Sequence, residues 1–171
     1  MLRALFVFFF SVICLCYQGH AYGKTDSVNS DRYALYYYCD RIDLQEDYLD
    51  NAMQMARIKD MLLHSPHIDS IAIYAYSSPE GSPKWNNWLA VKRAEAAKAF
   101  ILSNLSNDSI LHPENIILHP MGENWEGLYE ELYANYHLLN RDAVLRIMRA
   151  KVGTETKKWR LQNLDGGYTY T

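Results

Sequence analysis

The residues best suited to bind a ligand lie around one strand-to-helix junction. Ser77 and Ser78 stand where an apolar strand pattern ends, and a loop rich in serine, proline and glycine follows. The next helix pattern carries Asn86 in its first turn and Arg93 four residues after Leu89 on the apolar stripe. Helix N-termini attract anions, and an arginine fork with nearby amide donors can hold a carboxylate. The junction is therefore predicted to bind a small anionic group.

Other chemistry is less well supported by the pattern. Arg93 alone also fits a structural role in which its stem packs and its head extends into water. His64 and His67 flank a Ser-Pro turn without the further ligands that zinc needs. No Gly-x-Ser-x-Gly elbow surrounds the serines. We expect no metal, no cofactor and no catalytic residue.

Length and charge narrow the class of protein. The chain has 171 residues, which is enough for one domain with a real core but hardly for two. Its hydrophobic content is 49% and its formal net charge is −3. An acidic balance without a basic stripe argues against a nucleic-acid binder.

The N-terminus has the pattern of a secretory signal. A positive start is followed by an apolar run over residues 5–15, and small residues precede a cleavage position after Ala21. We expect residues 1–21 to be a signal peptide that is not part of the fold, and residues 22–31 to be a flexible leader. A lipoprotein, acylated on Cys14 or Cys16, stays an alternative. Cys39 would be the one remaining cysteine, and we expect it to be a buried, inert thiol.

Strand and helix patterns alternate along the rest of the chain. Strand patterns cover residues 33–39, 68–76 and 116–118, and helix patterns cover about 48–62 and 84–105. The predicted core stripe of the second helix consists of Trp85, Leu89, Ala97 and Ile101, with Ala94 beside it. Three further helices are expected after the candidate caps Asn124, Asn140 and Thr154. A last strand is expected over residues 168–170, which contain the C-terminal tyrosines. The order predicts an α/β (α+β layered) domain, with one sheet and helices packed on it.

The third helix and the tryptophans carry two further expectations. Leu128, Leu132 and Tyr136 are expected to line the inner face of the third helix. The tryptophans are expected in packing roles, except that Trp88 lies off the core stripe and remains a candidate for stacking on a sugar ring.

The junction also resembles a known signature. It is similar to that of the OmpA-like peptidoglycan-binding domain, approximately G-Y-T-D-x-x-G-S-x-x-Y-N-x-x-L-S-x-x-R-A. The matching residues are Ala75-Tyr76-Ser77, Gly81-Ser82, Trp85-Asn86, Leu89 and Arg93-Ala94. The resemblance covers roughly residues 33–125 and implies a β-α-β-α-β sheet with helices packed on it.

The resemblance also implies a ligand. In that family the aspartate after G-Y-T and the helix arginine bind the diaminopimelate of the peptidoglycan stem peptide. The arginine corresponds to Arg93, whereas the aspartate position holds Ser78. Either the acidic contact is lost in this chain or Glu80 has taken it over. The implied site therefore comprises Arg93, Ser77, Ser78, Asn86 and Glu80.

Two further motifs resemble a divergent branch of this family. They are Ser78-Pro79-Glu80-Gly81 and Glu123-Asn124-Trp125-Glu126-Gly127-Leu128, with a later Asp165-Gly166-Gly167. The branch occurs in envelope and fimbria-associated proteins of Gram-negative anaerobes, often before an outer-membrane barrel.

The motifs together lead to an expected organisation and function. We expect an OmpA-like domain over 32–125 and a helical extension over 126–171, whose completeness stays open. The resemblance implies a non-enzymatic, exported module of the periplasm, associated with the outer membrane, that binds peptidoglycan or an envelope partner. A structural module in barrel or fimbrial assembly, without a small ligand, is the alternative.

Overall fold

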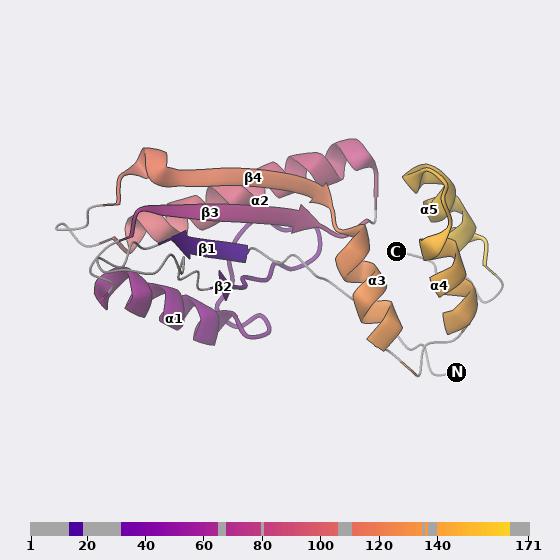
Figure 1. The fold of residues 1–171 in the computed structure, drawn as a ribbon, viewed down its shortest axis with the longest axis horizontal. Coiled ribbons are helices and arrows are strands. Elements are labelled where there is room, and N and C mark those ends of the chain that lie inside the picture. The colour runs from indigo at the N-terminus through magenta and orange to yellow at the C-terminus, as the bar shows by residue number, and fades with distance from the viewer. Residues whose placement is uncertain are drawn as a thin grey trace, which may run out of the picture.

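The elements of the protein are described by a computed structural model that covers residues 14–18, 32–64, 68–79, 81–105, 111–134, 136 and 140–164. Within these residues the protein is a mixed α/β structure, as the sequence predicts (Figure 1). The strands are β1 (Cys14–Gln18), β2 (Arg32–Tyr33), β3 (Ser70–Ser77) and β4 (Ile116–Glu123). The helices are α1 (Asn51–His64), α2 (Pro83–Ser103), the 3-10 turn η1 (Pro113–Asn115), α3 (Trp125–Ala134), α4 (Arg141–Arg149) and α5 (Thr154–Gln162).

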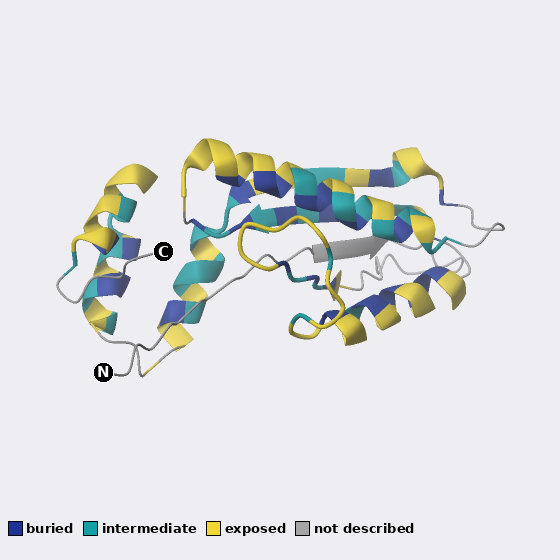
Figure 2. Ribbon diagram, turned by 180° about the vertical axis from the view of Figure 1, so that it is seen from behind, coloured by how far each residue is buried: buried dark blue, intermediate teal, exposed yellow. Residues whose placement is uncertain are grey.

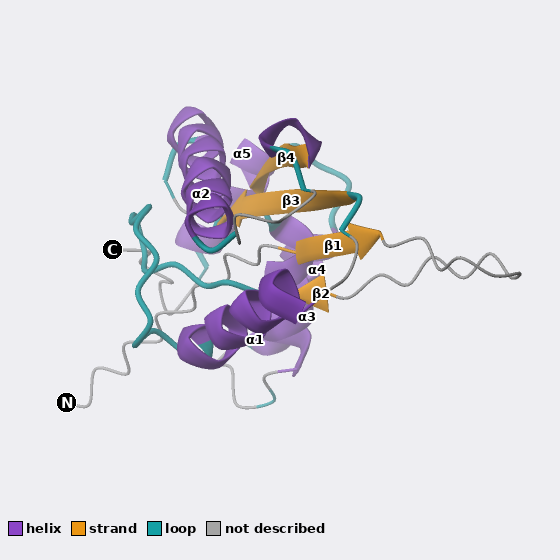
Figure 3. Ribbon diagram, turned by 90° about the vertical axis from the view of Figure 1, so that its left-hand side faces the viewer, coloured by secondary structure: helices purple, strands orange, loops and turns teal. Residues whose placement is uncertain are grey.

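One sheet and two helices form the larger part of the fold. The strand order is β2-β1-β3-β4, with β3 and β4 parallel and β1 antiparallel to both of its neighbours. Helices α1 and α2 lie on the same face of this sheet (Figure 3). On the other face, the rings of Tyr74 and His119 stack with their centroids 4.6 Å apart.

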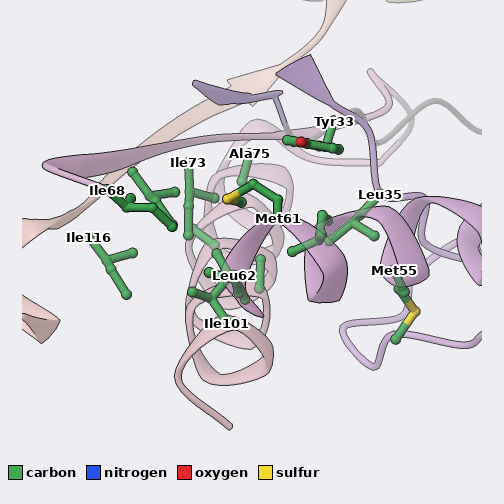
Figure 4. Close-up of a cluster of buried hydrophobic side chains, with 14 of the residues drawn as sticks. Tyr33, Leu35, Met55, Met61, Leu62, Ile68, Ile73, Ala75, Ile101 and Ile116 are labelled. Carbon is green, nitrogen blue, oxygen red and sulfur yellow. The ribbon is translucent and has the colours of Figure 1, made fainter. Parts of the chain in front are cut away.

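The period-two pattern of β3 determines which side chains enter the core. Ile71, Ile73 and Ala75 are each 1% exposed or less, while the residues between them are half-buried. They pack against apolar side chains of both helices, including Leu62 and Ile101 (Figure 4). Burying one such isoleucine is worth about 1.5–3 kcal/mol, so this layer contributes much of the stability.

The predicted strand over 33–39 is only partly present. Its alternation persists, since Leu35 and Tyr37 are fully buried, but strand pairing is recorded only for Arg32–Tyr33. The backbone of Tyr36 is bound instead by a side chain, because the Asn51 amide accepts from its N–H and donates to its carbonyl, both at 2.8 Å. This fully buried asparagine replaces a neighbouring strand.

Strand β1 falls inside the segment that the sequence identifies as a signal peptide. In the full-length chain it pairs antiparallel with β3, from Cys14↔Tyr74 to Gln18↔Ser70. The expectation that residues 1–21 stand outside the fold is thus not met by these five residues. The other residues of the signal and the leader over 22–31 lie outside the described residues. Cleavage after Ala21 stays a prediction, and it would remove the antiparallel partner of β3 but leave β4 paired with it.

The third predicted strand is longer than expected. Pro120 and Gly122 resemble turn signals, but β4 continues through both to Glu123. A register shift opposite Ala75 and Tyr76 accommodates the extra residue in β4. Its last residue therefore lies beside Ser77, the last residue of β3.

Helices α3, α4 and α5 lie at one end of the molecule (Figure 1). Their buried side chains form a second, smaller hydrophobic cluster. The prediction that Asn124 caps α3 is confirmed, because its side-chain oxygen accepts from the Gly127 N–H at 2.9 Å. Two cap predictions were inexact. Asn140 occupies the N-cap of α4 but its side chain makes no capping hydrogen bond to the helix, and Thr154 follows the N-cap Gly153.

The apolar face predicted for α3 is correct only in part. Leu132 is buried and Leu128 is half-buried against the same cluster. Tyr136, in contrast, lies past the end of the helix and is 79% exposed. The predicted strand over 168–170 lies outside the described residues.

Candidate functional site

The predicted junction is present where β3 meets α2. Strand β3 ends at Ser77, and Ser82 caps α2 by accepting a hydrogen bond from the Trp85 N–H at 3.3 Å. Gly81 has a φ of +71°, a left-handed conformation that favours glycine. Ser78 is half-buried, and Glu80 lies outside the described residues.

Arg93 turns its guanidinium into the protein. The residue is 3% exposed, and its three nitrogens donate to main-chain carbonyls. Nε reaches the carbonyl of Arg41 at 2.9 Å, and the two terminal nitrogens reach those of Tyr76 and Tyr38 at 3.1 Å each. The head group therefore joins the end of β3 to the loop over 38–50. The predicted placement beside the core stripe is correct, and the head group is turned inward instead of extending into water.

The surroundings of Arg93 explain how a buried cation is tolerated. Burial lowers the pKa of its guanidinium, and the nearby Tyr37, Cys39 and Asp40 act in the opposite direction. The cation lies 5.2 Å from the centre of the Tyr37 ring, whose hydroxyl donates to the Arg93 carbonyl at 3.0 Å. Burial raises the pKa of that Tyr37 hydroxyl above its ordinary value, although the neighbouring Arg93 lowers it. The network of carbonyls and an aromatic ring holds Arg93 in place without a carboxylate ligand.

The other predicted ligand residues are also engaged inside the protein. Asn86 is 2% exposed and donates to the Glu123 carboxylate at 2.7 Å. Ser77 is 1% exposed and its hydroxyl donates to the Gly122 carbonyl at 3.3 Å. The structure thus brings Ser77, Asn86 and Arg93 to the same end of β3, but it uses them to join elements together.

Sequence reasoning missed the charged centre of this end of the sheet. The Lys158 ammonium lies 2.5 Å from one Glu123 oxygen and donates to the Gly81 carbonyl at 2.9 Å. The other Glu123 oxygen accepts from the indole N–H of Trp125 at 2.9 Å. Glu123 and Trp125 belong to a motif that was recognised but given no role, whereas nothing local marks Lys158. This ion pair attaches α5 to the junction.

A left-handed backbone conformation explains one glycine at this centre. Gly122 has a φ of +71°, which other residues rarely adopt, and a Cβ atom there would lie 2.3 Å from the Asn87 side-chain oxygen. A side chain at this position would therefore strain the backbone and displace the Asn87 amide.

Exposed aromatic rings lie next to the junction. Trp85 and Trp88 are 44% and 41% exposed, and their rings stack with centroids 4.5 Å apart. The prediction that Trp85 belongs to the core stripe is wrong, because its indole N–H donates to Asp40 on the loop over 38–50. On that loop Tyr38 is 41% exposed, and its ring lies against that of Tyr48 with the centroids 3.9 Å apart and the planes tilted by 36°. We call Tyr38, Tyr48, Trp85 and Trp88 the aromatic patch.

Cys39 is exposed, which corrects the prediction of a buried thiol. The inward side chains alternate up to Tyr37, and the chain then turns at Cys39 and Asp40. Asp40 has a φ of +55°, so the turn ends the alternation and directs the next residues outward. The loop over 38–50 is accordingly exposed along most of its length (Figure 2).

Two further features are absent from the described part of the chain. Its side chains include no group of three or more His, Cys, Asp or Glu that could hold a metal ion. None of its helices is long and apolar enough to cross a membrane. His64 pairs with Asp60 at 2.9 Å, while His67 is not among the described residues.

Comparison of the chain with models of known protein families, with curated proteins and with solved structures found no match in any of the three.

Proposed function

We propose that this protein is a non-enzymatic, exported module of the periplasm and outer membrane that binds peptidoglycan or an envelope partner. The proposal includes the OmpA-like arrangement of the segment over 32–125. The observation that carries it is the convergence of the signature side chains Ser77, Asn86 and Arg93 on one end of β3. Bonds to distant segments, at residues 38–41 and 122–123, fix these three side chains in place. A site whose residues are already fixed loses little conformational entropy when a ligand binds.

The geometry limits how a stem peptide would be held. One N–H on each terminal nitrogen of Arg93 is already committed to a carbonyl. A carboxylate therefore needs either the remaining N–H groups or a movement of the loop over 38–50. In this proposal Arg93 anchors the junction from inside, and Ser78 and Glu80 contribute the contacts to the ligand.

Binding to purified sacculi tests the proposal. The exported protein should sediment with sacculi at low salt and stay in solution without them. Ser78→Asp should strengthen the binding if the acidic contact has been lost, because an added carboxylate can pair with the ammonium of diaminopimelate. Glu80→Gln should weaken it if Glu80 supplies that contact. Absence of wild-type binding would contradict peptidoglycan recognition.

A structural module in barrel or fimbrial assembly is the second candidate. It is favoured by the internal use of Arg93, Asn86 and Ser77, which leaves these side chains engaged with the protein itself. In that case sacculi should not retain the protein. Crosslinking in intact cells should instead join it to one outer-membrane or fimbrial protein, and the purified pair should form a complex again.

A further inference from the structure

We propose that the aromatic patch is a binding site for the pyranose rings of a neutral glycan strand. The inference deepens the proposed function, on which it rests, by assigning recognition to the sugar chain of the polymer. It differs from the stem-peptide contact implied by the family signature, because it involves another set of side chains.

The first support is the exposure of large aromatic rings. Trp85, Trp88 and Tyr38 are each more than 40% exposed, although they adjoin a well-packed core. Indole and phenol rings leave water favourably when a flat apolar surface covers them. Several such rings from two separate segments, α2 and the loop over 38–50, mark a surface that a ligand can cover.

The second support is that the rings are held in place before any ligand arrives. Asp40 accepts from the Trp85 indole N–H and so fixes the orientation of that ring. Arg93 binds the carbonyls of Tyr38 and Arg41, which lie on either side of this aspartate. A preorganised surface loses little conformational entropy on binding, which increases affinity.

The third support is charge, which selects the class of ligand. The loop over 38–50, which carries two of the patch rings, contains five aspartates and glutamates but one arginine, a net charge of −4. A surface in this segment repels polyanions such as nucleic acids and anionic lipids. A neutral sugar has flat C–H faces for stacking and hydroxyl groups at its edges. Asp40 can accept from such a hydroxyl, since a carboxylate has more than one acceptor position.

Titrations of the exported protein with separated parts of peptidoglycan test the inference. The probes are glycan strands freed of stem peptides, a soluble N-acetylglucosamine oligomer, and stem peptide alone, with tryptophan fluorescence and calorimetry as readouts. Both sugar probes should bind. Trp85→Ala and Trp88→Ala should each weaken binding about tenfold, the loss expected for roughly 1.4 kcal/mol of stacking.

A matched control is available on α5. Trp159 is 63% exposed but belongs to another element, so Trp159→Ala should leave sugar binding unchanged. Trp88→Ala leaves the Trp85–Asp40 contact in place, so it remains informative if Trp85→Ala fails to fold. Thermal melting establishes that each variant is folded.

Several outcomes would overturn the inference. If the protein binds sacculi but does not bind peptide-free glycan, the sugar site is refuted while the proposed function stays intact. Equal binding by wild type and both patch variants would do the same. A self-association that Trp88→Ala abolishes, without sugar binding, would assign the patch to a second copy of the chain.

Discussion

Replacing Arg93 with alanine should destabilise the fold, and the size of the effect follows from its contacts. The guanidinium donates three hydrogen bonds to the carbonyls of Arg41, Tyr76 and Tyr38 and lies over the Tyr37 ring. A hydrogen bond to a charged group contributes about 1.5–3 kcal/mol. The simple sum overestimates the loss, because the exposed loop can rehydrate its carbonyls and the cation no longer has to be desolvated. We expect a net cost of about 3 kcal/mol.

Urea unfolding and thermal melting measure this cost. For a domain of this size, about 3 kcal/mol corresponds to a fall in Tm of roughly 6–12 °C. Arg93→Lys should be intermediate, because an ammonium keeps the charge but lacks the planar fork that reaches three separate carbonyls. Hydrogen exchange should also accelerate in the loop over 38–50, since Arg93 holds it against the end of β3.

Lys92 provides the control on the same helix. Its side chain is 38% exposed and pairs with Glu95 at 2.7 Å, a surface ion pair worth about 0–1 kcal/mol. Lys92→Ala should therefore change stability by less than about 0.5 kcal/mol. If Arg93→Ala costs no more than Lys92→Ala, the guanidinium does not hold the loop and our reasoning is refuted.

The remaining predictions concern the charged centre, a titrating carboxyl and the N-terminus. Lys158→Ala should cost about 3 kcal/mol in urea unfolding, because it strands the nearly buried Glu123 carboxylate; a loss below about 1 kcal/mol would show that the pair is not needed. Burial raises the pKa of Glu131 from its ordinary 4.5 to about 7, so the folded state holds a proton that the unfolded state has lost. Stability should therefore fall as the pH rises from about 4.5 through 7, and Glu131→Gln should raise Tm at pH 8 but not at pH 4; an equal change at both values would contradict this. N-terminal sequencing of the exported protein should begin at Tyr22, and amide exchange in β3 should be faster than in the uncleaved chain, which keeps β1. An intact Met1 in the exported protein would count against the signal peptide.

Local pattern was sufficient for the parts of this protein that depend on neighbouring residues. The alternation of Ile71, Ile73 and Ala75 located β3 and its buried face. Asn124 was predicted as a cap because a cap needs only a side chain and the backbone three residues on. Arg93 was placed beside the core stripe by helical spacing, and that placement is correct.

Long-range contacts could not be predicted in the same way. The head group of Arg93 binds carbonyls 52 and 55 residues earlier in the chain, and Lys158 reaches a glutamate 35 residues away. The buried Asn51 satisfies the backbone of Tyr36, which ends a predicted strand. No spacing in the sequence encodes such partners, because they depend on how the chain closes in three dimensions.

The sequence by itself thus determined a mixed α/β domain, the strand-to-helix junction and the residues that gather there. Only the tertiary structure decided what those residues do. It turned Arg93, Asn86 and Ser77 inward as links between elements, and it left Trp85 and Cys39 exposed. The physical reason is that burying a polar group requires a partner for each donor and acceptor. Those partners came from distant segments, so the same residue types could line an open site or hold the fold together.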